Sequence, residues 1–441
     1  MSKLLYLDAA RMGQMSPSAR RASVDFARFA SEYGCSLYLN RFLENGFDAW
    51  PKALRDEFRG LQDWHGVTPL KQRLRLLAEA RSDVNVMIAA RSASLMKVGA
   101  RLLFARCRRV LITDLTWGSY ERILRHEQPQ RARSVTKIAL RRDVFRHRLS
   151  TEEIVSRIAT AYRESQCDGL FLPLVDCFGV KLPVAQVVER IRAEADLRFV
   201  VVDGAQAINH VSLGLHTDYC DFMLAGCHKW LCSFMPMGVG FYGRPKTVDY
   251  IKSSISRWQK RGAIDDPLFT FSDELETGGV RRFGESVVVS PMIVANSAVV
   301  DATNSPDKSD LVGKNRRLIA EVATGNTNWK LLSPASDAST RIMMLRSRAP
   351  EHRCLSPYEL RDKFHAAGVA VSTYRGARVR ISVPSHKLGR DDLRRLQLAF
   401  GQTEYEIPYS RMSHSSVTSS AETQQRFCSP STVNFPKSQL P

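Results

Sequence analysis

Two polar side chains that could carry amine and acid chemistry each follow an apolar run in the sequence. Asp203 ends the run Phe199-Val-Val-Val, and Lys229 comes shortly after Phe222-Met-Leu-Ala-Gly. Buried strands of parallel sheets are apolar in this way, and residues just past their carboxyl ends face the ligand crevice of an open α/β sheet. A lysine removed from water has a lowered pKa and can form a Schiff base with a carbonyl compound, while a carboxylate can pair with a pyridinium nitrogen. The pair therefore indicates a pyridoxal 5'-phosphate (PLP) site anchored at Lys229, although the spacing taken alone favours two residues that merely end strands, with Asp203 capping a turn.

The elements that would position these residues alternate along the chain. We expect strands at 84–89, 109–113, 135–140, 169–175 and 199–203, and helices at 92–104, 117–124, 150–165 and 183–195. The stretch Ser150-Thr-Glu-Glu153 fits a capping box at the start of one helix. Strands alternating with helices imply right-handed crossovers and a largely parallel sheet. The sequence therefore predicts an α/β fold.

The chain divides into four predicted segments. An N-terminal arm with helices, packing on the small domain, spans 1–60, and a large domain spans 61–300. A small C-terminal α+β domain spans 301–402, with strands at 341–346, 369–373 and 377–383 and helices at 356–367 and 390–400. The Ser/Thr/Gln-rich segment 403–441 is predicted to be a disordered tail.

Composition limits the class of protein. The 441 residues are 44% hydrophobic and 25% charged, which is ordinary for a globular protein. No apolar run is long enough to cross a bilayer and the start lacks a signal-peptide core, so we expect a cytoplasmic protein without a membrane partner. The nine cysteines are scattered and lack metal-site spacing, so no metal is expected.

A strong positive charge is the one unusual feature of the composition. The formal net charge is +19, and its densest part lies at 131–148, where we expect a strand and a turn. No nucleic-acid-binding signature surrounds this run. A solvated basic face, or arginines gathered near anionic partners, is therefore preferred to a nucleic-acid site.

Three motifs carry a resemblance to a known family. They are Val202-Asp203-Gly-Ala-Gln206-Ala, Cys227-His228-Lys229-Trp230-Leu, and Met237-Gly238-Val-Gly240-Phe. Together they resemble the class-V aminotransferase family of fold-type-I PLP enzymes, which includes cysteine desulfurases, kynureninase, aminotransferases and the isopenicillin-N-epimerase-like group. The resemblance covers roughly residues 4 to 400. It implies the PLP-transferase fold type I, with a large domain around a mainly parallel, seven-stranded type of sheet, a smaller α+β domain, and a homodimer.

The resemblance also implies roles for the motif residues. Lys229 would form the Schiff base with PLP and then move protons at the substrate carbon. Asp203 would pair with the pyridinium nitrogen. Gln206 would bond to the phenolic oxygen of the ring, and His228 would contact the phosphate.

Three further assignments rest on looser matches. Trp117 would stack on the cofactor ring, or it is a core aromatic residue. Ser92 and Ala93 would lie in a strand-to-helix turn that cradles the phosphate, or Ser92 is an ordinary helix cap. Arg380 would grip the substrate carboxylate in a two-pronged contact, which we prefer to a surface arginine on an edge strand.

Several positions depart from the family pattern. Asp176 stands where the family usually has an asparagine beside the phenolic oxygen, so it would have to be protonated there or bond elsewhere. Gly226 replaces the usual phosphate-binding serine, and Glu285 lies in the loop 282–286 that would reach a neighbouring subunit's phosphate. The stretch 372–377 has no cysteine, which argues against desulfuration through a persulfide.

The sequence thus predicts a PLP-dependent enzyme that acts on an amino acid or amine, of the aminotransferase type. A PLP-dependent epimerase or a C–S or C–N lyase would use the same residues. The departures from the family pattern support a third hypothesis beside the aminotransferase and the epimerase or lyase. In this hypothesis the chain is a catalytically degenerate binding or regulatory protein.

Overall fold

The structure is a computed structural model that describes residues 4–128, 133–278, 286–306, 308–325 and 328–401. Contacts group residues 1–403 into one compact unit. The predicted disordered tail and the loop at 282–285 lie outside the described residues. The predicted division at 60, 300 and 402 stays a prediction.

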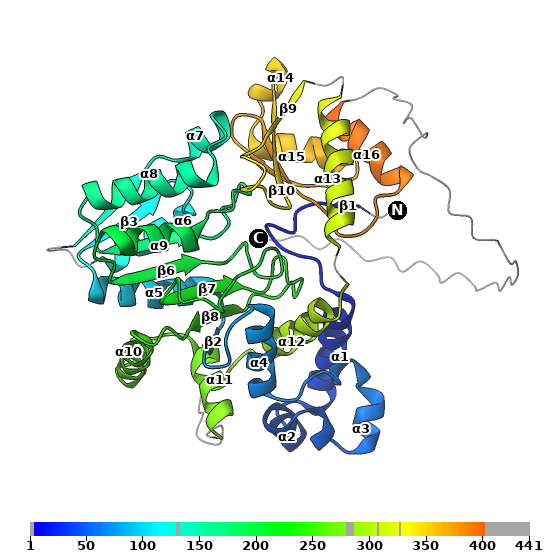
Figure 1. The fold of residues 1–441 in the computed structure, drawn as a ribbon. Coiled ribbons are helices and arrows are strands. Elements are labelled where there is room, and N and C mark those ends of the chain that lie inside the picture. Colours follow the sequence, from blue (N-terminus) through cyan, green and yellow to red (C-terminus); the bar gives the residue numbers. More distant parts are fainter. Residues whose placement is uncertain (1–3, 129–132, 279–285, 307, 326–327, 402–441) are drawn as a thin grey trace, which may run out of the picture. The chain divides into compact units, whose positions relative to one another are not determined.

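A central sheet of seven strands is mainly parallel, as predicted (Figure 1). Its strands lie in the order β2-β8-β7-β6-β5-β3-β4. The strand β8 is antiparallel to both of its neighbours, and the pairings that join β4, β3, β5, β6 and β7 are parallel. The strands are β2 (Asn85–Ala89), β3 (Arg109–Thr113), β4 (Ser134–Ile138), β5 (Gly169–Pro173), β6 (Phe199–Asp203), β7 (Phe222–Gly226) and β8 (Gly238–Tyr242).

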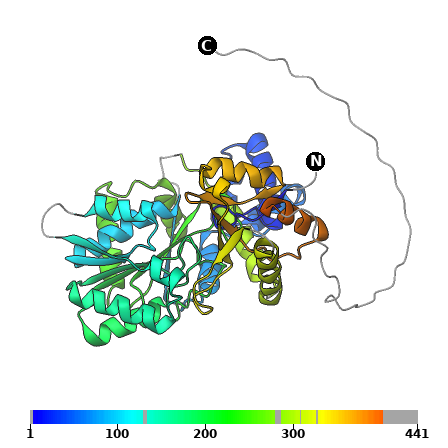
Figure 2. The ribbon, with the colours of Figure 1, turned by 90° about the horizontal axis from the view of Figure 1, so that it is seen from above.

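Helices cover both faces of this sheet because its strands are apolar on both sides. In β6, Val200 and Val202 belong to one buried cluster, while Phe199 and Val201 belong to the other. In Figure 2 the strands lie between two layers of helices. The first layer contains α4 (Val67–Leu77), α8 (Thr151–Glu164), α9 (Val184–Glu194) and α12 (Ser290–Thr303). The second contains α5 (Ser92–Arg106), α6 (Gly118–Glu127) and α10 (Val248–Lys260).

A second, smaller sheet is antiparallel and stands beside the carboxyl ends of the central strands. Its order is β12-β13-β10-β9, formed by β9 (Trp329–Leu332), β10 (Ile342–Ser347), β12 (Ser372–Tyr374) and β13 (Arg378–Ser382). Four helices accompany it, namely α13 (Ser309–Thr324), α14 (Pro350–Arg353), α15 (Pro357–Ala366) and α16 (Arg390–Phe400). The N-terminal strand β1 (Leu5–Tyr6) pairs with β11 (Val369–Ala370), so the N-terminal arm is joined to the segment between α15 and β12.

The N-terminal helices pack through aromatic side chains. Phe29 and Phe42 both stack on Trp50. Their ring centroids lie 4.7 and 4.6 Å from the centroid of the Trp50 ring. Ser16 caps α1, because its side chain accepts a bond from the backbone of Ala19 at the start of this helix. The elements are α1 (Pro17–Tyr33), α2 (Leu37–Asn45), η1 (Phe47–Ala49), α3 (Lys52–Glu57) and η2 (Arg59–Leu61).

Some elements were not predicted. The structure has a short helix α7 (Arg141–Arg146) where we expected a turn, and α10, α11 (Pro267–Thr277), α13 and β9 where we expected no defined element. Asp114 explains α7, because its Oδ1 accepts bonds from the backbone N–H groups of Leu140 and Arg141 at 2.8 and 2.9 Å. A cap supplied by a residue 26 positions away gives no local signal. By contrast, the local capping box at Ser150 and Glu153 is present as predicted.

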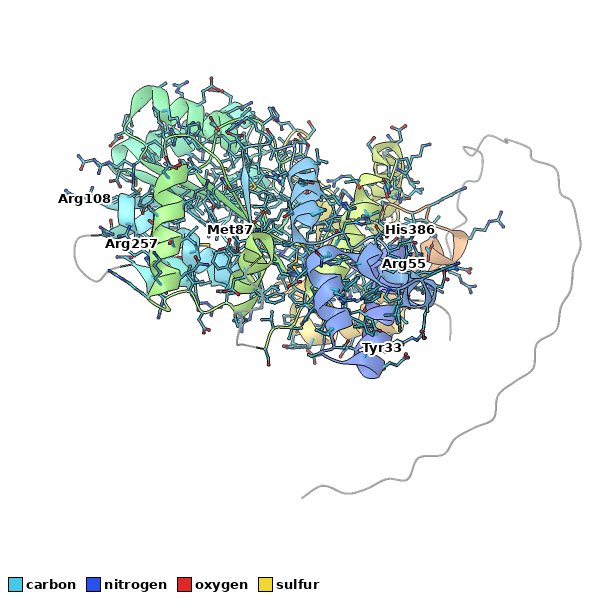
Figure 3. The ribbon with its side chains drawn as sticks, turned by 90° about the horizontal axis from the view of Figure 1, so that it is seen from below. Tyr33, Arg55, Met87, Arg108, Arg257 and His386 are labelled. Carbon is cyan, nitrogen blue, oxygen red and sulfur yellow. The ribbon has the colours of Figure 1, made fainter. Side chains whose placement is uncertain are left out.

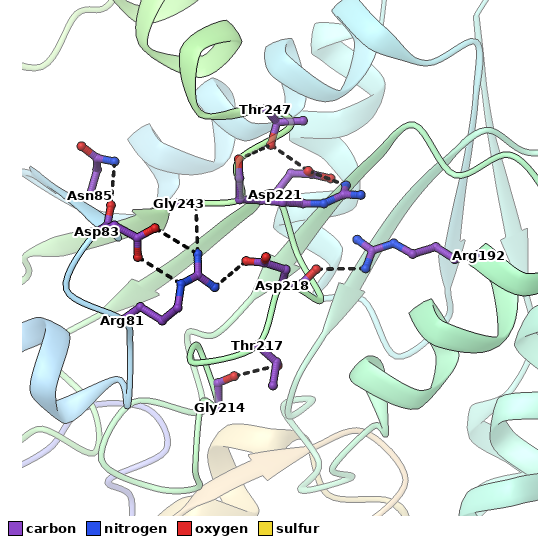
Figure 4. A network of polar contacts seen from close by, with 11 residues as sticks. Arg81, Asp83, Asn85, Arg192, Gly214, Thr217, Asp218, Asp221, Gly243 and Thr247 are labelled. Carbon is purple, nitrogen blue, oxygen red and sulfur yellow. Dashed lines mark hydrogen bonds and ion pairs between the residues drawn. The ribbon is translucent and has the colours of Figure 1, made fainter.

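Asp221 is a buried carboxylate at the amino ends of β6 and β7, and it holds these two strands in place (Figure 4). Asp221 accepts bonds from the backbone of Val200 at 2.7 Å, from Arg244 at 2.8 Å and from the Thr247 hydroxyl at 2.8 Å. It therefore joins the start of β6 to the start of β7 and to the segment that enters α10. These are the two strands that end near Asp203 and Lys229.

Much of the positive charge lies on the surface. Arg108 and Arg257 are exposed at the periphery of the molecule, whereas Met87 is buried in its interior (Figure 3). None of the helices that the structure describes is long and apolar enough to cross a membrane. The described residues also contain no cluster of His, Cys, Asp and Glu that could hold a metal ion.

Candidate active site

A cleft of about 970 Å³ lies where the carboxyl ends of β5, β6 and β7 meet the small sheet. This volume suits a cofactor together with a small substrate. All nine residues predicted for the site line it, namely Ser92, Ala93, Trp117, Asp176, Asp203, Gln206, His228, Lys229 and Arg380. The structure therefore brings together residues that lie as much as 288 positions apart, from Ser92 to Arg380.

Asp203 is the buried acid of the cleft. It is the last residue of β6, it is 5% exposed, and its Oδ1 accepts a bond from the backbone of Ala205 at 2.8 Å. Burial raises the pKa of Asp203 to about 6, while the Ala205 bond and Lys229 act in the other direction. The carboxylate is therefore mostly ionised at pH 7.

Lys229 is the amine of the cleft. It follows β7 by three residues, and burial lowers its pKa to about 8. Asp203 opposes this lowering, whereas the positive charge of Arg380 adds to it. About a tenth of the amine is thus neutral at pH 7, and this is the form that attacks a carbonyl carbon.

The N-terminal arm supports the backbone of Lys229 through a glycine that the sequence analysis missed. Gly13 donates its N–H to the carbonyl oxygen of His228 at 2.7 Å. A Cβ atom at position 13 would lie 2.0 Å from the carbonyl oxygen of Lys229 and 3.1 Å from the Cα of Cys232. No side chain fits there, so Gly13 sets where the lysine backbone can lie.

We expect Gly13→Ala to displace Lys229 and slow its reaction with added PLP by about 10²-fold, because ångström-scale misplacement of a reacting group has effects of that size. The rate is measured as the growth of a visible absorption band. Gly313→Ala is the matched control, because a Cβ atom at that position in α13 meets nothing within 4 Å. A Gly13→Ala rate equal to that of the control would contradict this role.

Gln206 is held by the protein on both sides of its carboxamide. Its Nε2 donates to the carbonyl oxygen of Ala10 at 2.7 Å, and its Oε1 accepts from Trp230 Nε1 at 2.8 Å. An amide nitrogen has two hydrogens, so one N–H is left for the predicted bond to a ring oxygen. The arm and Trp230 thus fix the orientation of this side chain.

His228, Ser92 and Gly226 meet at the N-terminus of α5. The Nδ1 atom of His228 is buried and has no partner in the described part of the chain. A Cβ atom at Gly226 would lie 3.1 Å from the His228 ring and 3.6 Å from Ser92 Oγ. Burial, assisted by Lys229, lowers the pKa of His228 to about 4, so the ring is neutral. An orphaned buried nitrogen beside the free N–H groups of a helix start fits a phosphate group.

Two aromatic residues, Trp117 and Tyr120, line the cleft next to Ser92. Trp117 directly precedes α6 and is 49% exposed, so it is not a core residue. Its ring lies edge-on to Tyr120, with centroids 5.0 Å apart, and the buried Tyr120 hydroxyl donates to Ser92 Oγ at 2.9 Å. Tyr120 was missed because a buried tyrosine in a helix has no distinctive sequence signal.

Asp176 bonds within its own turn. Its Oδ1 accepts from the backbone of Phe178 at 2.9 Å and of Val180 at 2.8 Å. Its Oδ2 is buried without a partner among the described residues, and burial raises the pKa of Asp176 to about 6. Asp176 thus shapes the turn after β5 through Oδ1, and its role toward a cofactor stays a prediction.

Arg380 is buried, not a surface residue on an edge strand. It is 4% exposed, and β13 lies between β12 and β10. Its Nη2 atom is 3.2 Å from Asp8 Oδ1 and 3.1 Å from Ser372 Oγ, and its Nη1 donates to the carbonyl oxygen of Cys177 at 3.3 Å. Its Nε is buried and has no partner in the described residues. Asp8 was missed, because nothing in the sequence links positions 372 residues apart.

The comparison with protein families agrees with this geometry. Residues 171–256, which contain both Asp203 and Lys229, match the model for aminotransferase class-V. The resemblance predicted from the sequence motifs is therefore confirmed for this segment. No curated protein sequence matches the chain.

Solved structures share the fold at low sequence identity. A C-DES mutant with glycine covalently linked to its PLP cofactor is 12% identical with a TM-score of 0.61, covering 91% of this chain and 97% of that one. The cysteine desulfurase CsdA from Escherichia coli is 12% identical with a TM-score of 0.61, covering 90% and 93%. The ureidoglycine-glyoxylate aminotransferase from Bacillus subtilis is 14% identical with a TM-score of 0.58, covering 90% and 93%.

These comparisons identify the fold of the chain and the family that one segment matches. The fold is the PLP-transferase fold type I, as predicted, and the segment around Lys229 is that of class-V aminotransferases. They support pyridoxal 5'-phosphate as the cofactor. Lyases and aminotransferases both occur among the similar structures, so the class does not specify one reaction.

Proposed function

We propose that this chain is a PLP-dependent enzyme of the aminotransferase type, which acts on an amino acid or amine through Lys229. The observation that carries the proposal is the pairing of Asp203, with a pKa raised to about 6, and Lys229, with a pKa lowered to about 8, in one cleft. When bound, PLP supplies a ring that withdraws electrons from the substrate carbon.

The residues of the cleft fit the parts of this cofactor. The neutral His228 and the start of α5 would hold the phosphate, and Trp117 would lie against the ring. Asp203 would hold the positive charge of the ring nitrogen, because an ionised carboxylate in a site removed from water attracts a cation strongly. Gln206 would donate its remaining N–H to the ring oxygen.

Lys229 would have two tasks. Its neutral Nζ would hold the cofactor covalently. Its Nζ would also accept the proton that leaves the substrate carbon and return it at another atom. The guanidinium of Arg380, through its free Nε, would bind the carboxylate of an amino-acid substrate.

The second candidate is a PLP-dependent lyase or epimerase, which would use the same residues. A desulfurase-type route through a persulfide is disfavoured by the chemistry of Cys177, which lines the cleft. Burial raises the pKa of Cys177 to about 12, so its thiol stays protonated and is a poor nucleophile. We further propose a homodimer, which the mass measured by light scattering would test.

Adding PLP to the purified protein tests the proposal and its pH dependence. We expect a visible absorption band whose rate of formation rises about tenfold per pH unit up to pH 8 and then levels off, because only the neutral amine reacts. A lysine with an unperturbed pKa would be less than about 1% neutral at pH 8. The rate of band formation would then continue to rise above pH 8. A protein that stays colourless would overturn the proposal, and a transfer assay with a keto acid would separate transamination from ammonia or sulfide release.

A further inference from the structure

The cleft contains more positive charge than the proposed roles use. Besides Lys229 and Arg380, four arginines line it, namely Arg11, Arg91, Arg141 and Arg361. The acidic residues among its lining are Asp176, which bonds within its turn, and Asp203. Asp8 offsets the charge of Arg380, and the phosphate of a bound cofactor would offset part of the rest.

Arg141 is the arginine best placed for a further ligand group. Its Nη2 donates to the carbonyl oxygen of Asp114, a neutral group, and its Nε is buried without a partner in the described part of the chain. Its guanidinium carbon lies 4.7 Å from the centre of the Phe178 ring. The backbone contact and the ring hold the guanidinium in place without neutralising its charge.

Two aromatic rings connect Arg141 to Arg380. The ring of Phe178 lies 5.5 Å from that of Tyr374, at an angle of 63°. The guanidinium carbon of Arg380 lies 5.8 Å from the centre of the Tyr374 ring. All four residues line the cleft, so its wall presents two guanidinium groups separated by an aromatic surface.

The electrostatics of neighbouring groups agree with two cations acting on one space. The charges of both Arg380 and Arg141 oppose the burial that raises the pKa of Cys177. Farther out, the pKa of Arg378 is lowered by burial and by repulsion from Arg346 and Arg141. An anion placed beside Arg141 would relieve this repulsion.

We propose that Arg141 binds a second anionic group of the substrate, so that the cleft takes an amino acid with an acidic side chain, its α-carboxylate on Arg380 and its side-chain anion on Arg141. This identity of the substrate rests on the proposed function, whereas the binding of two anionic groups does not need the cofactor. The side-chain anion is a carboxylate or a phosphorus oxyanion, since either matches a guanidinium fork.

The test measures by calorimetry how tightly the protein binds small ligands when no PLP is added. We expect glutarate, with two carboxylates, to bind at least about tenfold more tightly than butyrate, with one. Arg141→Gln should remove most of this gain, and Arg141→Lys should restore part of the gain. The control is Arg142→Gln, which changes the adjacent, exposed arginine and should keep the full gain.

Equal affinities of the wild type for glutarate and butyrate would overturn the proposal, as would an Arg141→Gln variant that keeps the gain. Binding of butyrate by the variant shows that it is folded. Replacing glutarate with 3-phosphonopropionate tells which anion is preferred, since the tighter ligand identifies the group. Because PLP takes no part, a failure here is distinct from a protein that forms no visible band.

Discussion

Lys229→Ala is expected to remove the visible band formed with PLP and to lower turnover by roughly 10⁴-fold. Alanine has no amine to form the covalent bond, and it has no base to move the substrate proton. Both tasks fall on the same atom in our account, so both are lost together. Absorption spectra and initial rates with a responsive amino acid measure the two effects separately.

The control for this variant is Lys246→Ala. Lys246 is exposed and follows β8, as Lys229 follows β7, and we expect its removal to change neither readout. A Lys229→Ala protein that keeps the band would show that another amine holds the cofactor. A protein that loses the band but keeps its turnover would show that Lys229 is not the base.

Asp203→Asn is expected to lower turnover by about 10²–10³-fold while the protein still takes up PLP. A neutral amide cannot balance a positive ring nitrogen, and removing one partner of a buried charge pair costs about 3–5 kcal/mol. The covalent bond itself depends on Lys229, so the band should remain. Single-turnover rates measure the loss.

The same variant should change the pH dependence in a known direction. Asp203 favours the charged form of Lys229, so its removal lowers the pKa of Lys229 below about 8. The rise in the rate of PLP attachment should therefore level off at a lower pH than in the wild type. Asp196→Asn, at an exposed carboxylate, is the control, and a profile of Asp203→Asn that matches this control would refute the coupling.

The parts of the site that lie next to one another in sequence could be predicted. Asp203 and Lys229 follow apolar strands, and the parallel arrangement of β6 and β7 puts their ends at one edge. The capping box at Ser150 is contained in four consecutive residues. In each case the physical cause is local, so the sequence carries the signal.

The parts formed by distant residues could not be predicted. The carboxylate of Asp8 pairs with Arg380 because β1 joins β11 beside the small sheet, and this pairing has no periodic pattern. Position 13 must be glycine because a Cβ atom there would lie 2.0 Å from the carbonyl oxygen of Lys229. Glycines are common in loops for other reasons, so the sequence gives no sign of this contact. Such contacts appear only once the chain is folded.

Asp176 shows how a substitution can look more disruptive in sequence than in structure. Set beside the family motif, an acid there would meet a ring oxygen with no proton to donate. In the structure its Oδ1 accepts two backbone bonds from its own turn, which an asparagine oxygen could also do. The substitution therefore keeps the turn intact, while Oδ2 has no partner among the described residues.

The most direct test of Lys229 as the covalent anchor is to add PLP to the 441-residue protein, reduce it with borohydride and map the peptides by mass spectrometry. We expect one phosphopyridoxyl group per chain, on the peptide that contains Lys229. Modification at another lysine, or none after reduction at pH 8, would contradict the assignment of Lys229 as the covalent anchor.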